Sequence, residues 1–89
     1  MTDAAAPVID FTTFVLSLST SALMHLGAIP NPEGETSKEV ALALAKQTID
    51  ILGMLEQKTD GNLTGDEERL LDEVLADLRL RYVTATKPR

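Results

Sequence analysis

An uncharged stretch near the amino terminus constrains this chain more than any other feature. From Phe11 to Pro32 there is no Asp, Glu, Lys or Arg. Helical spacing places one set of its apolar residues on a single face: Phe11, Phe14, Val15, Leu18, Ala22 and Leu26. Leu16, Leu23 and Met24 point elsewhere on the same predicted helix. Because a helix that is apolar on several sides is normally buried on several sides, this segment needs more neighbours than a small single chain supplies.

Start and stop signals predict three helices, over residues 10–26, 37–59 and 65–83. The first has an N-cap and a glycine stop, and each of the other two opens with the Thr-x-x-Glu spacing of a capping box. These signals are Asp10, Gly27, Thr36 with Glu39, and Thr64 with Glu67. The prolines and glycine of the segment that follows the first helix predict a connection there.

The predicted fold class is all-α, with a single helical domain over residues 10–83. Residues 1–9 are expected to form a flexible leader and residues 84–89 a flexible tail. The short connection between the second and third helices predicts that these two form an antiparallel αα-hairpin.

The second and third helices differ in how many apolar faces they carry. The third has one apolar stripe and an opposite charged side, as an ordinary amphipathic helix does. The second has two adjacent apolar lines, which predicts contact with more than one neighbour: Val40, Leu44, Ile51 and Leu55 on the first line, and Leu42, Ala45, Ile49 and Leu52 on the second.

Size and composition leave few other ways to stabilise the chain. It has 89 residues, no cysteine and one histidine, so a disulfide framework and a Cys/His zinc site are both excluded. A domain this small often needs disulfides, a bound metal or oligomerisation to be stable. The net charge of −6 argues against nucleic acid as a partner, since nucleic-acid binders carry a basic patch.

The uncharged first helix and the lack of a disulfide or zinc site predict self-association, as a homodimer or a higher symmetric oligomer. The predicted interface lies on the first helix and comprises Phe11, Phe14, Val15, Leu18, Ala22, Leu23 and Leu26. The same helix is nearly long enough to cross a membrane, but its many hydroxyl residues and the lack of Lys or Arg at its flanks disfavour a span. Peripheral membrane binding through this helix stays an alternative.

Candidate catalytic and metal-binding residues all have simpler structural explanations. Ser21 and His25 share a helix face, but a serine within a regular helix lacks the strained turn and oxyanion hole of a nucleophile. The segment from Asp60 to Asp66 partly matches a calcium loop, yet Leu71 stands where a bidentate Glu is required. We therefore predict no enzyme, no cofactor, and neither catalytic nor metal-binding residues. A small-ligand or metal-binding protein that uses His25 is the alternative.

The order of several motifs resembles the DUF1844 family, small bacterial proteins of unknown function. The motifs are SLSTSALMHLG, the PNP turn, AKQTIDILGMLE and KT-GNLT, and the resemblance covers about residues 11–83. It implies a bacterial origin and a cytoplasmic setting, and it brings no activity, cofactor or catalytic residue. The sequence thus favours a non-enzymatic interaction or scaffold module that assembles with itself, with an unidentified protein as a possible further partner.

Overall fold

Local hydrogen bonds fix both ends of the first helix in the computed structural model, which describes residues 9–31 and 37–87. Helix α1 spans Phe11–His25, and the Asp10 carboxylate caps it by accepting a bond from the Thr13 N–H at 2.8 Å. That bond holds the pKa of Asp10 below its ordinary value. Just beyond the helix, Gly27 has a φ of +80°, which suits a residue without a side chain.

The end of α1 is a Schellman motif, which satisfies carbonyls that the helix leaves unpaired. The Ala28 N–H donates to the Leu23 carbonyl at 2.9 Å, and the Gly27 N–H donates to the Met24 carbonyl at 3.1 Å. The predicted glycine stop is therefore confirmed.

Helix α2 spans Lys38–Lys58 and begins one residue later than its predicted capping box requires. Its N-cap is Ser37, whose hydroxyl accepts a bond from the Val40 N–H at 3.2 Å. The predicted box of Thr36 with Glu39 is therefore wrong, and Thr36 itself lies outside the described residues. Serine and threonine are both strong N-caps, and the adjacent serine holds the position.

A tight turn joins α2 to α3, which spans Gly65–Thr86. Gly61 has a φ of +84°, and the Asn62 N–H donates to the Thr59 carbonyl at 2.8 Å, as in a type II turn. The predicted capping box at the start of α3 is confirmed, because the side chains of Thr64 and Glu67 each accept a bond from the other's backbone N–H.

Helix α3 continues three residues beyond its predicted end at residue 83. The Thr86 hydroxyl donates to the Tyr82 and Val83 carbonyls, and Lys87 is the first extended residue, with ψ of 133°. A residue that precedes a proline is driven out of the helical region, and Pro88 follows Lys87 in the sequence. The predicted tail therefore starts too early, whereas the predicted leader lies, except for Ile9, outside the described residues.

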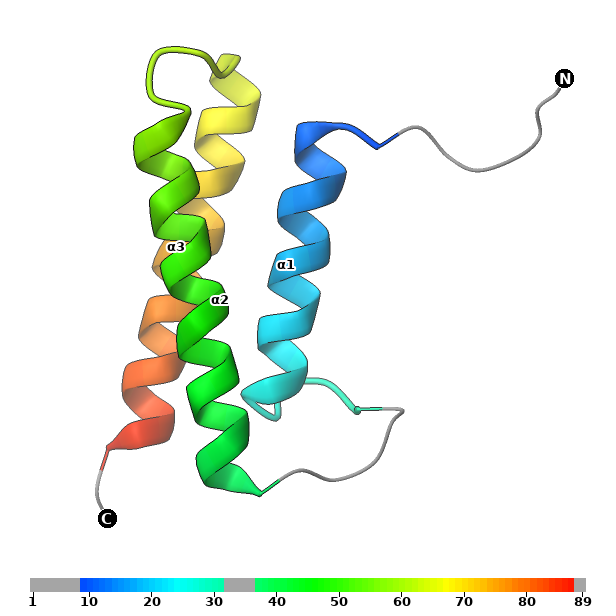
Figure 1. Cartoon of the computed structure of the whole chain (residues 1–89), viewed down its shortest axis with the longest axis vertical. Helices are drawn as coiled ribbons and strands as arrows, with labels where there is room; N and C mark the ends of the chain where they lie inside the picture. The colour runs from blue at the N-terminus through cyan, green and yellow to red at the C-terminus, as the bar shows by residue number, and fades with distance from the viewer. Residues whose placement is uncertain (1–8, 32–36, 88–89) are drawn as a thin grey trace, which may run out of the picture.

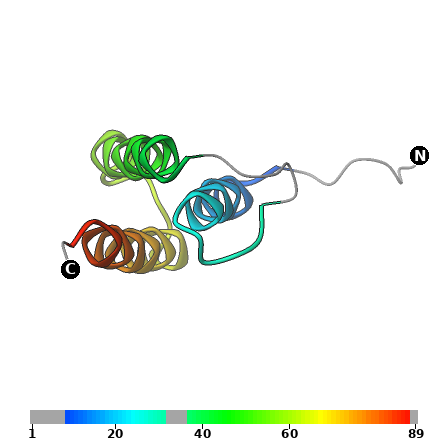
Figure 2. The same cartoon turned by 90° about the horizontal axis from the view of Figure 1, so that it is seen from below.

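The helices form an up-down-up bundle in which each contacts the other two. Figure 1 shows α1 and α3 running opposite to α2, and the end-on view in Figure 2 shows the three at the corners of a triangle. The αα-hairpin of α2 and α3 and the all-α fold are as predicted. The buried apolar core draws on all three helices: Val15, Ala22, Ala45, Ile49, Leu52, Leu71, Leu75 and Leu78.

Candidate interaction surface

The face of α1 that the sequence predicts as an oligomer interface is mainly the face that packs against α2 and α3. Val15 and Ala22 have no exposed surface and belong to the core. A second copy cannot contact side chains that the chain's own helices already cover, so the prediction is wrong for these two residues. Periodicity shows which residues share a face, and here that face meets the chain's own core.

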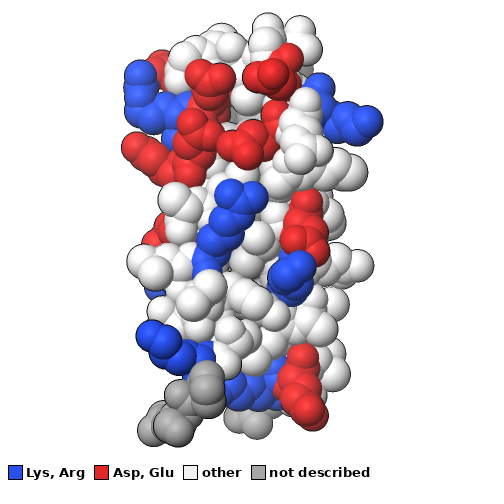
Figure 3. Space-filling view, turned by 90° about the vertical axis from the view of Figure 1, so that its left-hand side faces the viewer, with Lys and Arg blue, Asp and Glu red and all other residues white. Residues whose placement is uncertain are grey.

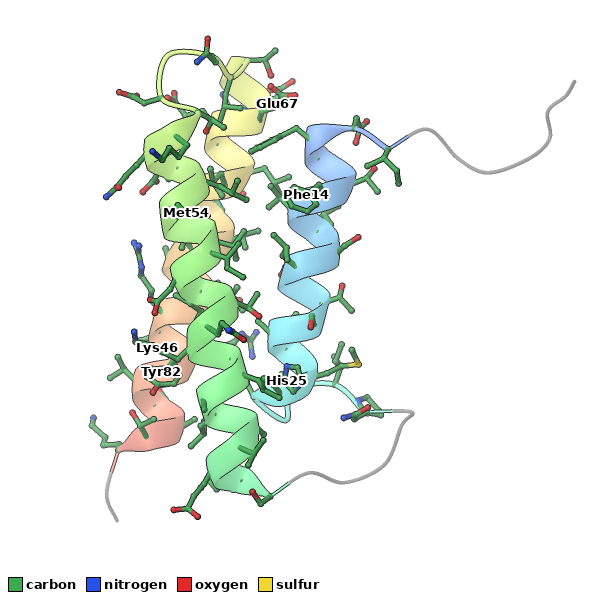
Figure 4. All side chains as sticks on the ribbon, in the orientation of Figure 1. Phe14, His25, Lys46, Met54, Glu67 and Tyr82 are labelled. Carbon is green, nitrogen blue, oxygen red and sulfur yellow. The ribbon has the colours of Figure 1, made fainter. Side chains whose placement is uncertain are left out.

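The other five predicted interface residues differ in exposure. Four are partly buried and pack against the core: Phe11, Leu18, Leu23 and Leu26. Phe14 is 42% exposed and lies at the level of Met54 on the neighbouring helix in Figure 4. Phe14 therefore offers more surface to a second copy than the other four, and their part in an interface stays a prediction.

A row of apolar and uncharged residues lies along the outside of α2. We call it the α2 row; its members recur at helical spacing and are Val40, Ala43, Leu44, Gln47, Ile51 and Met54. Val40 and Met54 are each 50% exposed and Leu44 is 36% exposed. The second apolar line of α2, with Ile49 and Leu52, faces the core.

Helical spacing in the sequence predicts that part of this row shares one face of the helix, but it does not assign that face to an interface. It grouped Val40, Leu44 and Ile51 with Leu55, which the structure packs against the core. The presence of two apolar lines on α2 was the available signal. Since α1 and α3 occupy one side of α2 only, the other line is left without a partner in the chain.

A shallow groove of about 390 Å³ runs along the α2 row and has a charged edge. Its lining is Ala43, Lys46, Gln47, Asp50, Ile51 and Met54. The Lys46 ammonium donates to both carboxylate oxygens of Asp50, at 3.0 and 2.8 Å. This bond, and then the attraction of the carboxylate, raise the pKa of Lys46. The pair is more than half exposed, so it adds little stability and serves as a polar rim to the row.

Charged residues are spread over the side of the bundle away from α1. Figure 3 shows Lys, Arg, Asp and Glu spread over the face formed by α2 and α3, with acidic side chains gathered toward the turn that joins them. Near this turn the pKa of Glu56 is raised, first by a hydrogen bond between the carboxyl groups of Glu56 and Asp72, and then by burial and the repulsion of Asp72. By contrast, α1 carries no Asp, Glu, Lys or Arg.

A second concave feature lies where the carboxyl end of α1 meets the start of α2. It has a volume of about 400 Å³, and its lining includes Met24, His25, Leu26, Lys38 and Leu42. His25 is the last residue of α1, one residue before the predicted end at residue 26. Its Nδ1 is buried and has no hydrogen-bond partner among the described residues, so that nitrogen receives no orienting bond from Ser21. The pairing needed for nucleophilic catalysis is not made through this atom.

The segment from Asp60 to Asp66 is accounted for by helix termini, because Gly61 makes the turn and Thr64 caps α3. Within residues 9–31 and 37–87, no group of three or more His, Asp or Glu side chains is placed to hold a metal ion. The described part of the chain also contains no helix with the length and hydropathy needed to span a bilayer.

Comparison with known proteins gives one match. The sequence profile of a domain of unknown function, DUF1844, matches residues 8–84. No curated protein and no solved structure matches the chain.

Proposed function

The chain belongs to the DUF1844 family, a domain of unknown function, and we propose that it is a self-associating interaction module without catalytic activity of its own. The observation that carries the proposal is the exposed α2 row, which lies beside a helix without a charged residue. The proposal includes a bacterial, cytoplasmic setting, and that part rests on the family resemblance alone.

The size of the core supports self-association. Eight apolar side chains are buried in the described residues, and two of the eight are alanines. Small domains with small cores are marginally stable unless something else is added. Cysteine is absent from the chain, so burial of the outer apolar side chains against another chain is the available addition.

The exposed apolar side chains also set the expected strength of association. Val40, Leu44 and Met54 are each one-third to one-half exposed, and burying the remainder contributes roughly 1 kcal/mol for each side chain. Summed over two copies, this gain is of the same order as the lower estimates of the entropic cost of association, about 4 kcal/mol and above. The difference is much smaller than the roughly 8 kcal/mol of a micromolar complex, so these side chains alone predict a weak, reversible dimer rather than an obligate complex.

Size-exclusion chromatography with light scattering over a dilution series that extends from micromolar to millimolar concentration tests the proposal. The expected result is a mass that rises toward at least twice the 9.6 kDa of the chain as concentration increases. A constant monomer mass across the series, for a protein whose circular dichroism shows folded helices, would rule the proposal out.

The cavity at the end of α1 favours a second candidate, a binding protein for a small apolar ligand. Its volume of about 400 Å³ is within the usual range for small-molecule sites, and the buried Nδ1 of His25 lacks a partner among the described residues. This function predicts that His25→Ala changes the binding of anilinonaphthalene sulfonate, an anionic fluorophore whose aromatic rings bind apolar sites, and leaves the oligomeric mass unchanged. Equal fluorophore binding by both proteins would exclude a role for His25.

A further inference from the structure

Four members of the α2 row form two pairs about Gln47. Val40 and Met54 lie seven positions before and after it, and Ala43 and Ile51 lie four positions before and after it. Offsets of four and seven residues return to the same helix face. Resting on the proposed self-association, we infer that a second copy of this chain docks antiparallel on the α2 row, with a two-fold axis beside Gln47.

The antiparallel arrangement makes these two pairs complementary across the contact. A two-fold axis at Gln47 places each residue opposite the one that lies equally far on the other side of the axis. Val40 then meets Met54 of the second copy, about 10 Å along the helix from the axis, and Ala43 meets Ile51 about 6 Å from it. The small alanine faces the larger isoleucine, so the shallow groove lined by both residues can receive the opposing side chain.

Gln47 lies on the axis and faces its own copy. A glutamine amide has both donors and an acceptor, so two opposed amides can pair with each other. One polar residue at the centre of an apolar helix contact fixes the register, because other registers bury the amide against side chains that cannot bond to it. Gln47 therefore reinforces the register that the Val40–Met54 and Ala43–Ile51 pairs already set, and these pairs remain when Gln47 is replaced.

The charged rim is also self-complementary in this arrangement. A two-fold axis perpendicular to α2 brings each flank of the helix against the same flank of the second copy. Lys46 then lies about 3 Å along the helix from Asp50 of the second copy, while the two Asp50 residues are about 9 Å apart. The ion pair that Lys46 makes with its own Asp50 is thereby extended across the contact.

Single-cysteine cross-linking tests the register directly, because the natural chain contains no cysteine. Gln47→Cys places two thiols at the axis, within reach of the Cα separation of about 5.5–6 Å that a disulfide needs. Val40→Cys is the matched control: it lies on the same row at 50% exposure, but its two copies are about 20 Å apart in the antiparallel arrangement. Both positions are on the surface, so circular dichroism of the reduced proteins should match the natural chain.

Under mild oxidation, Gln47→Cys is expected to form disulfide-linked dimers at least about tenfold faster than Val40→Cys, because docking raises the effective thiol concentration at the axis alone. Equal rates, or a faster rate for Val40→Cys, in a protein that light scattering shows to be dimeric would overturn the antiparallel docking and leave the self-association intact. A natural chain that stays monomeric would overturn both, and would assign the row to a different protein.

Discussion

Adding one methyl group to two glycines should change stability in opposite directions. Gly27 and Gly65 both have open space around the position of a new Cβ, with no atom within 4 Å. They differ in the backbone: Gly27 has a φ of +80°, whereas Gly65 is the first residue of α3 and its φ is not in the positive region. Since no neighbour is displaced at either site, the backbone alone determines the sign.

The magnitude follows from two opposing terms. An alanine held in the left-handed region costs roughly 1–2 kcal/mol, and a Gly→Ala change returns about 0.4–1 kcal/mol by reducing the entropy of the unfolded chain. Gly27→Ala should therefore lower the free energy of unfolding by about 1 kcal/mol, which corresponds to a fall in Tm of about 4–8 °C for a domain of this size. Gly65→Ala should raise it, by at most about 1 kcal/mol, because alanine is favoured over glycine in a helix.

Urea unfolding followed by far-ultraviolet circular dichroism, at one fixed chain concentration, measures both variants. The slope of free energy against urea should stay the same, so that the shift of the midpoint reports stability. If Gly27→Ala is as stable as the natural chain, or if both variants shift in the same direction, the assignment of Gly27 as a left-handed helix terminus is refuted.

Three further changes test the core, a cap and a carboxyl pair. Leu52→Ala removes a side chain with no exposed surface and should cost about 2–5 kcal/mol in urea unfolding; a cost below about 1 kcal/mol would contradict the assigned core. Thr64→Ala removes the N-cap of α3 and should cost about 1 kcal/mol, whereas Thr64→Ser, which keeps the hydroxyl, should cost much less. The pKa of Glu56 is raised above its ordinary value of 4.5 in the folded chain. Between pH 4.5 and the folded pKa, the folded chain therefore keeps a proton that the unfolded chain has lost. As a result, the free energy of unfolding falls as pH rises through this range. Glu56→Gln should remove that fall and raise stability at neutral pH by at most about 1 kcal/mol; an unchanged pH profile would show that the pair with Asp72 does not form.

The helices could be predicted from the sequence because their ends are set by local chemistry. The capping box of Thr64 and Glu67 and the glycine at the end of α1 each involve residues within one or two turns. Where two local signals compete, the predicted helix end differs from the observed one by one or more residues. Ser37 rather than its neighbour caps α2, and α3 continues to Thr86, where the following proline rather than the polar composition of the tail determines the end.

The use of each helix face could not be predicted in the same way. Helical spacing correctly grouped Val15 and Ala22 on one side of α1, but nothing in the spacing distinguishes a face that meets the chain's own helices from one that meets a second chain. That choice depends on how three helices of this length pack together. Because α1 packs beside α2, Val40 and Met54 stay exposed on the outside of α2. The exposed apolar face without a partner is therefore on α2, whereas the sequence predicted it on α1.

Sedimentation equilibrium of two charge variants tests most directly whether the α2 row is the contact between copies. Met54→Glu places a carboxylate on the row, four residues before Lys58, where it also supports the helix. Leu80→Glu makes the same change at a side chain that is 67% exposed on α3. We expect Leu80→Glu to associate like the natural chain, and Met54→Glu to raise the dissociation constant at least about thirtyfold, about 2 kcal/mol, with unchanged helix content. Equal association by all three proteins would contradict the account.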